Sequence, residues 1–196
     1  RTIARNGLLP ELDQSISSSF ILITRETAAD MAEAAVRLVE HVLPEKYGYD
    51  FMSDVQVLAP MRKGDCGVIA LNTALQQSLN PPSADRSTDN SRREFRVGDR
   101  VMQTRNNYNP QEAGPDKGFA KNGAAEESPQ GIFNGETGIV HALDETTGDM
   151  TVLFDDNRLI CYDIQTQDDL SLAYAITVHK SQGSEYPAVV LTLPPG

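Results

Sequence analysis

The chain has 196 residues, of which 39% are hydrophobic and 23% charged, and its formal net charge is −11. This size allows one large or two small domains with a core, and no apolar run approaches the roughly 18 residues that span a bilayer. The acidic balance excludes strong non-specific DNA binding by the whole surface.

The first predicted strand is the apolar run Phe20–Ile23. A helix is predicted from about 26 to 43, with acids in its first turn and Pro44 at its end. Another strand, Val55–Ala59, should follow and lie buried in the same sheet.

A loop at 60–67 then leads into a second helix, for which Asp65 is the candidate N-cap. The apolar residues on one face of this helix are Val68, Leu71, Leu75 and Leu79. The alternation of strands and helices predicts a parallel α/β sheet.

The pattern changes after a Pro-, Ser-, Asp- and Asn-rich stretch at 80–94, which is typical of a linker. Short strands with turn residues between them then predict a small antiparallel barrel or meander. A segment at 110–131, poor in large apolar residues, is expected to be a flexible excursion. The predicted barrel strands are Arg100–Thr104, Thr137–Leu143, Met150–Phe154 and Leu159–Tyr162.

The last segment returns to α/β character. A three-turn helix is favoured over a buried strand between Ser171, a good N-cap, and Gly183, a suitable C′ glycine. A buried parallel strand is predicted at 188–193. The expected fold is therefore an α/β domain, residues 1–94 and 171–196, interrupted by a β-barrel at 95–170.

Charge is unevenly spread along the sequence. Residues 86–105 hold six arginines against three acids, whereas residues 144–169 hold eight acids and one arginine. A local basic stripe suits a protein that contacts a phosphate backbone along one groove. A solvated arginine-rich loop is the alternative. The six arginines are Arg86, Arg92, Arg93, Arg96, Arg100 and Arg105.

The most informative motif is Thr-Val-His-Lys-Ser-Gln-Gly-Ser-Glu at 177–185. Its hydroxyls and Lys180 could bind phosphates, Gly183 would let a backbone approach closely, and Glu185 could hold a ribose hydroxyl. The residues alone are equally compatible with a structural polar end of a helix.

This motif strongly resembles motif V of RecD-like and Pif1-like helicases, superfamily 1 motors that move 5′ to 3′. The continuation through Tyr186 and Pro187 favours the RecD-like group. The resemblance implies DNA contacts by Thr177, His179, Lys180 and Ser181, and a nucleotide cleft near Gln182, Gly183 and Glu185.

Two further stretches are similar to the same family. Val57-Leu-Ala-Pro-Met-Arg-Lys-Gly64 resembles motif IV, which implies that Arg62, and less directly Lys63, approaches the triphosphate. Residues 95–107 and 133–138 resemble the start of an SH3-like barrel beside single-stranded DNA. The contacting candidates there are Arg105, Asn106, Asn107 and Tyr108, although turn chemistry explains many of these residues equally well.

The sequence contains no P-loop, Gly-x-x-x-x-Gly-Lys-Ser/Thr. The resemblance implies that ATP lies between two RecA-like domains, of which this chain supplies one wall. We therefore expect no catalytic residue here, ATP and Mg²⁺ only in the full-length protein, and no ATP hydrolysis by this chain alone. Its start at Arg1 and its end at Gly196 predict an excised segment, truncated before motif VI.

No metal site or catalytic triad is predicted from the scattered histidines, His41, His141 and His179. The acid pairs 155–156 and 168–169 fit hairpin-tip and helix-start positions better than metal binding. Two isolated cysteines, and no charged-then-apolar leader, favour a cytoplasmic protein with free thiols.

The sequence thus favours a fragment of a RecD-like, ATP-dependent DNA helicase that acts in unwinding and recombinational repair. Its expected partners are single-stranded DNA and other exonuclease V subunits, with no membrane. The alternatives are a Pif1-like or conjugative-relaxase helicase, and a non-catalytic DNA-binding module that keeps the fold.

Overall fold

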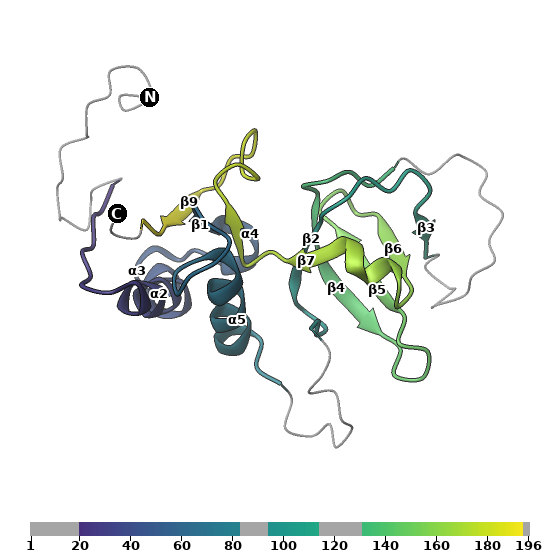
Figure 1. Cartoon of the computed structure of the whole chain (residues 1–196), viewed down its shortest axis with the longest axis horizontal. Coiled ribbons are helices and arrows are strands. Elements are labelled where there is room, and N and C mark those ends of the chain that lie inside the picture. The colour runs from purple at the N-terminus through teal and green to yellow at the C-terminus, as the bar shows by residue number, and fades with distance from the viewer. Residues whose placement is uncertain (1–19, 83–93, 114–130, 194–196) are drawn as a thin grey trace.

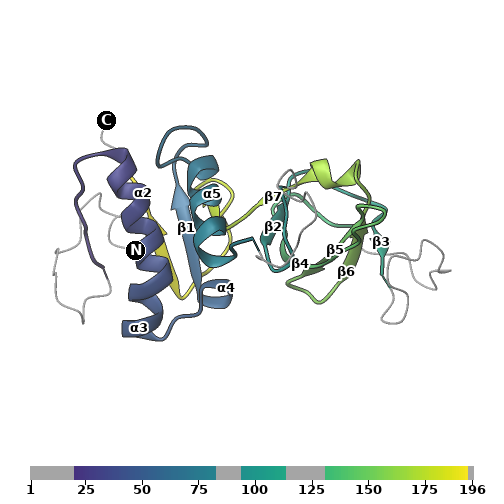
Figure 2. The ribbon, with the colours of Figure 1, turned by 90° about the horizontal axis from the view of Figure 1, so that it is seen from below.

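The computed structural model of the chain describes residues 20–82, 94–113 and 131–193. The described residues form a parallel β-sheet with helices and, beside it, an antiparallel β-sheet (Figures 1 and 2). Most of the predicted linker and excursion, with Arg86, Arg92 and Arg93, lies outside the described residues.

The helical elements are α2 (Ala28–Arg37), the π-helical turn η1 (Leu38–Val42), α3 (Leu43–Tyr47), α4 (Phe51–Asp54), α5 (Val68–Leu79) and the 3-10 turn η3 (Thr166–Asp169). The parallel strands are β1 (Val55–Ala59), β8 (Ala175–Thr177) and β9 (Ala188–Leu191). The antiparallel strands are β2 (Arg100–Gln103), β3 (Gln111–Glu112), β4 (Thr137–Leu143), β5 (Met150–Phe154), β6 (Leu159–Tyr162) and β7 (Leu170–Leu172). No helix within these ranges is long and apolar enough to cross a membrane.

The first helix is longer than predicted. It begins after Thr27, whose hydroxyl oxygen accepts a hydrogen bond from the Asp30 N–H at 3.1 Å. Pro44 does not end it, because this proline lies in the first turn of α3, where its missing N–H is tolerated. The helical run ends instead at Gly48, which has a left-handed φ of 71°.

Strand β1 lies at the centre of the parallel sheet, in the order β8-β1-β9, and all five of its residues are buried. Four of them are apolar, as is typical of a strand buried on both faces, and the fifth is Gln56, whose side chain bonds to the Ala173 and Tyr174 carbonyls. Its Val57 belongs to one core with Val39 of η1 and with Leu71 and Leu75 of α5. The predicted strand at 55–59 and the predicted helix after it are therefore confirmed.

Two predicted burials are wrong. Strand β9 does pair parallel with β1, and its Ala188 and Val190 pack against the core. Val189 and Leu191, on the opposite face of the strand, are 49% and 48% exposed. The segment Phe20–Ile23 belongs to neither sheet of the described residues, and its side chains are 40% to 46% exposed. An apolar run alone therefore does not determine that a segment is buried in a sheet.

The six antiparallel strands follow the order β3-β6-β5-β4-β2-β7. Strands β4, β5 and β6 have the predicted bounds, and β2 ends one residue earlier than predicted. Alternate residues point inwards, as in Val140 of β4 opposite Val152 of β5, both almost completely buried. This sheet therefore encloses a core separate from that of the parallel sheet.

The predicted helix at 171–183 is wrong. Residues 170–172 form β7, which pairs antiparallel with β2, and residues 175–177 form β8, which pairs parallel with β1. The intervening Ala173 and Tyr174 are completely or almost completely buried. A nearly continuous apolar run suits a buried strand and a buried helix equally, so periodicity could not separate them.

A buried carboxylate joins the two sheets. Asp99, fully buried, accepts hydrogen bonds from the side chains of Gln76 at 2.5 Å, Asn80 at 2.7 Å and Tyr174 at 2.8 Å, and from the Arg96 N–H at 2.7 Å. Two of these donors come from α5 or its end, and one from the chain entering β8. The four donors compensate for removing this group from water and hold the antiparallel sheet against α5.

Candidate nucleic-acid interface

Two loops start side by side at the carboxyl ends of β1 and β8. Ala59 is opposite Thr177 in the parallel register, and the Val178 N–H donates to the Ala59 carbonyl at 3.2 Å. Ligands of open α/β sheets bind at this end of the strands. The predicted motif IV and motif V segments therefore share one edge of the sheet.

The loop at 60–67 is folded back onto the start of α5. The N–H groups of Val68 and Ile69 donate to the carbonyls of Met61 and Arg62 at 3.0 and 3.1 Å. These bonds satisfy the first free N–H groups of the helix. The prediction that Asp65 is the N-cap is therefore wrong, since the N-cap is Gly67 and no side chain caps the helix. Arg62 and Lys63 are exposed, as a ligand-binding role requires.

The loop after β8 is a compact turn. The N–H groups of Lys180 and Ser181 both point to the Thr177 carbonyl, at 2.9 and 3.3 Å, and the Ser181 hydroxyl donates to the Val178 carbonyl at 2.8 Å. Gly183, with a φ of 88°, closes it. His179, Lys180, Gln182 and Glu185 are thereby exposed beyond the sheet edge.

Lys180 reaches the antiparallel sheet. Its Nζ donates to Asn134 Oδ1 at 2.7 Å, across 46 residues of sequence. Partial burial, and then the positive charge of Arg62, lower the pKa of Lys180 below its usual value. The two cations of the motif IV and motif V loops are thus near enough to repel each other.

The turn that holds Asn134 is stabilised by Arg158. This guanidinium contacts Glu136 at 2.6 Å, Asp156 at 2.5 Å and the Gly131 carbonyl at 2.9 Å. Glu136 in turn accepts a hydrogen bond from the Phe133 N–H at 3.0 Å. A charge-assisted network therefore fixes the whole 131–136 turn.

The predicted barrel candidates lie next to this turn. Asn106 Oδ1 accepts from the Asn134 N–H at 2.9 Å, and its Nδ2 donates to the Tyr108 hydroxyl at 3.1 Å. The Tyr108 and Phe133 rings meet edge to face, with centroids 6.2 Å apart. Both rings are exposed, Tyr108 by 67% and Phe133 by 47%. This pair offers an aromatic face of the kind on which bases stack.

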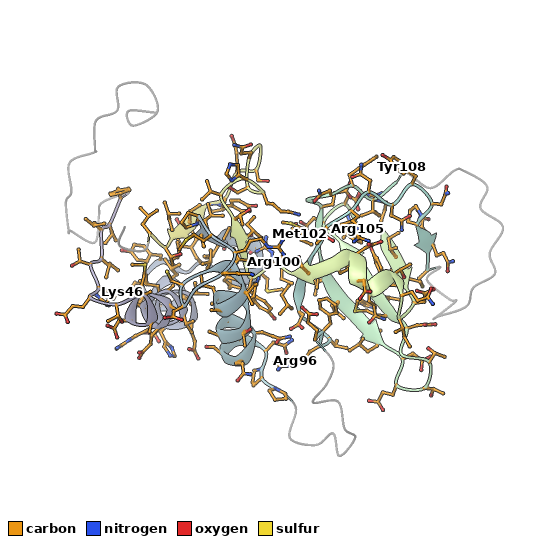
Figure 3. The ribbon with its side chains drawn as sticks, viewed as in Figure 1. Lys46, Arg96, Arg100, Met102, Arg105 and Tyr108 are labelled. Carbon is orange, nitrogen blue, oxygen red and sulfur yellow. The ribbon has the colours of Figure 1, made fainter. Side chains whose placement is uncertain are left out.

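The other two candidates have structural partners. Asn107 exchanges backbone hydrogen bonds with Ile132, and its side-chain oxygen accepts from the Asn109 N–H at 3.1 Å. Arg105 forms an exposed ion pair with Asp169 at 3.3 Å. Arg105 and Tyr108 extend from the same end of the antiparallel sheet (Figure 3).

The described arginines do not form one basic stripe. Arg100 is buried at the junction of the sheets and donates to the Val55 carbonyl at 3.2 Å, and burial lowers its pKa. Arg96 donates to the Asn80 carbonyl at 2.6 Å. Figure 3 shows Arg96, Arg100 and Arg105 at three separate places. Sequence clustering of charge therefore did not produce spatial clustering.

Three of the four paired acids have protein partners. Asp155 accepts a short hydrogen bond from the Thr137 hydroxyl, and Asp156 and Asp169 pair with arginines. Within the described ranges no group of three or more His, Cys, Asp or Glu could hold a metal ion.

The sequence motifs do not single out Asn134 and Phe133 as functional residues. Both belong to the segment 133–138, which the sequence marks only as part of the start of the barrel. An exposed aromatic residue next to a turn asparagine was the available signal.

Comparison with known proteins supports the predicted barrel. Residues 71–154 match the family profile of the ATP-dependent RecD-like DNA helicase SH3 domain, so the antiparallel sheet is SH3-like, as the sequence predicted. Residues 172–196 match the UvrD-like helicase C-terminal domain.

Two relatives match over parts of the chain. An ATP-dependent RecD2 DNA helicase of Deinococcus radiodurans is 37% identical over 136 residues, which are 69% of this chain and 16% of the relative. The RecBCD enzyme subunit RecD of Buchnera aphidicola is 39% identical over 64 residues, 33% of this chain and 11% of the relative. The chain therefore spans a small part of the length of the curated relatives that it matches.

Proposed function

Because this chain belongs to the RecD-like helicase family, we propose that it forms one wall of an ATP site and part of a single-stranded DNA path in an ATP-dependent helicase. The parallel sheet would belong to the second RecA-like motor domain. Movement 5′ to 3′, action in DNA repair, association with exonuclease subunits and a cytoplasmic location are parts of the same proposal.

The observation that carries the proposal is the hydrogen bond between Lys180 and Asn134. It connects the loop at the carboxyl end of β8 with the turn that carries Phe133, one of the two rings of the exposed aromatic pair. A phosphate-binding cation and a base-stacking surface are thereby held together, and single-stranded DNA offers both groups in alternation.

The residues at the sheet edge fit a polyphosphate. Arg62 is exposed and close enough to lower the pKa of Lys180, and a nucleotide phosphate bound at Arg62 would relieve the repulsion between the two cations. When bound, ATP would supply the phosphoryl group whose hydrolysis drives movement. The residues of this chain that would face it are Arg62, Lys63, Gln182, Gly183 and Glu185. Magnesium ligands would come from the P-loop domain, because this sequence has no P-loop.

The DNA side of the interface would use both sheets. Lys180 would contact a phosphate, and Tyr108 with Phe133 would stack a base. The other residues proposed to face DNA are Thr177, His179, Ser181, Arg105, Asn106 and Asn107.

Binding of this chain to a fluorescein-labelled oligothymidylate, measured by anisotropy at several salt concentrations, tests the DNA part. Lys180→Ala should weaken binding and lower the salt slope by about 0.7, the value for one single-strand phosphate contact. Lys46→Ala is the matched control, since it removes an exposed lysine at the far end of the molecule (Figure 3). Equal salt slopes for the two variants would show that Lys180 does not contact the DNA phosphates.

The ATP part is tested in the full-length protein. Arg62→Ala should lower DNA-stimulated ATP hydrolysis at least tenfold, the effect of a lost charge contact to a transferring phosphoryl group. The 196-residue chain alone should show no ATPase activity above background. Normal hydrolysis by Arg62→Ala, or ATP hydrolysis by the chain alone, would contradict the proposal that this chain forms one wall of the ATP site. Absence of ATPase activity in the unmodified full-length protein would favour a non-catalytic DNA-binding module.

A further inference from the structure

Four polar residues form a hydrogen-bonded line from one sheet to the other, through three side-chain groups and the side chain and backbone N–H of Asn134. Lys180 donates to the side chain of Asn134, whose backbone N–H donates to Asn106, and Asn106 donates to the hydroxyl of Tyr108. The three distances are 2.7, 2.9 and 3.1 Å. A cation at the parallel sheet is therefore connected to an aromatic ring on the barrel through two neutral amides.

Both ends of this line stand on rigid structure. Arg158 fixes the 131–136 turn, and the backbone pairing of Asn107 with Ile132 fixes the residue between Asn106 and Tyr108. Lys180 itself belongs to the compact turn anchored on Thr177. The relative positions of the ammonium group and the ring are thus determined by the fold.

The line contributes little to stability, because its members are exposed and such hydrogen bonds exchange readily with water. Its chemistry suits positioning instead. A carboxamide oxygen holds the Lys180 ammonium without neutralising its charge, whereas a carboxylate at 134 would cancel that charge. The lysine is therefore oriented and remains attractive to a phosphate.

We propose that Asn134 and Asn106 are positioning residues that hold the Lys180 ammonium and the Tyr108 ring at the spacing of a phosphate and an unstacked base of single-stranded nucleic acid. This line of residues from Lys180 through Asn134 and Asn106 to Tyr108, here called the relay, rests on the proposed DNA function of the same interface. It makes Asn134 a determinant of that site although it belongs to a turn.

Oligothymidylate binding by the whole 196-residue chain tests the relay. Asn134→Ala should reduce the affinity about three- to tenfold, the loss expected for one typical solvent-exposed hydrogen bond. Asn134→Asp should reduce the affinity further and lower the salt slope, because its carboxylate neutralises Lys180. Gln77→Ala removes an exposed carboxamide from α5 and should change neither quantity.

A double-mutant cycle gives a readout that a merely structural role would not move. In the unmodified chain, Lys180→Ala and Tyr108→Ala together should lose less affinity than the product of their separate losses. When Asn134 is already alanine, the combined loss of affinity should equal the product of the separate losses of Lys180→Ala and Tyr108→Ala. Independent losses in both backgrounds, or full affinity of Asn134→Ala, would overturn the relay while the DNA function stands.

Nuclear magnetic resonance without DNA separates the relay from the DNA function. Lys180→Ala should shift the side-chain amide signals of Asn134 and Asn106 and the ring signals of Tyr108, and Lys46→Ala should shift none of them. Signals that move at Asn134 alone would overturn the relay. Propagation to Tyr108 in a chain that binds no oligothymidylate would overturn the DNA function, and the hydrogen-bonded line would then be a structural connection only.

Discussion

The phenol of Tyr174 donates a hydrogen bond of 2.8 Å to the carboxylate of Asp99. Both groups are buried, and they lie 75 residues apart in the sequence. Since Tyr174 stands between β7 and β8, this bond fixes the point where the chain passes from the antiparallel to the parallel sheet.

Replacing Asp99 with asparagine should lower the free energy of unfolding by about 2–4 kcal/mol, because an amide NH₂ would face donors that now point to a carboxylate. Urea unfolding followed by circular dichroism measures the change. Glu145→Gln, in an exposed turn, is the matched control and should change stability by less than about 0.5 kcal/mol. Equal stability of the two variants would mean that Asp99 does not hold the sheets together.

Stability should fall at alkaline pH because of Tyr174. Burial, and then the charge of Asp99, raise the pKa of this phenol above its usual value of 10.0. The unfolded chain releases the proton near pH 10 while the folded chain keeps it, so the unfolding free energy falls as pH rises above about 10.

Tyr174→Phe should flatten this alkaline decline in melting temperatures measured between pH 8 and 12. Burial likewise raises the pKa of Tyr162, which donates to Gln103 in the barrel core. Tyr162→Phe should therefore flatten a separate part of the decline, and the double variant should show both effects. An unchanged decline in Tyr174→Phe would contradict the prediction.

The close approach of Gly67 to its own loop should make this position intolerant of a side chain. A Cβ there would lie 2.5 Å from the Lys63 carbonyl oxygen and 2.9 Å from that of Arg62. Gly67→Ala should cost about 1–3 kcal/mol of stability and displace Arg62. Asp65→Ala in the same loop should have little effect on stability. A large loss of stability in this variant would support the prediction that Asp65 caps α5.

Arg158 should stabilise the turn that carries Phe133 and Asn134. Arg158→Ala removes the contacts to Glu136, Asp156 and the Gly131 carbonyl and should lower the unfolding free energy by about 1–3 kcal/mol. Oligothymidylate affinity should fall with it. Arg158→Lys keeps the charge but not the planar fork, so an intermediate effect is expected; full recovery by lysine would show that charge alone matters.

Strand positions in the barrel could be predicted from the sequence because alternation and turn residues are local signals. The bounds of β4, β5 and β6 follow directly from them. The strands in the segment 171–183 could not be predicted in this way, because its apolar residues are buried by pairing with strands about 70 to 118 residues earlier in the chain. Tertiary pairing decided between helix and strand there.

The candidate site was predicted in part. The loops bearing Arg62 and Lys180 do meet at one sheet edge, which follows from parallel strands. The contact between Lys180 and Asn134 depends on how the two sheets are joined, and no local pattern encodes that junction. For the same reason the basic stripe predicted from the sequence includes Arg96 and Arg100, although both side chains bond at the junction of the sheets.

The pairing of β2 with β7 has a consequence for folding. Gln56 of β1 bonds to the carbonyls of Ala173 and Tyr174, which follow 117 and 118 residues later. Closing so long a loop costs entropy and slows folding. If the barrel forms first, its register of Val101 against Leu172 brings both ends of the insertion together. The barrel would then act as an intramolecular tether that makes β8 a near neighbour of β1 before the parallel sheet is complete.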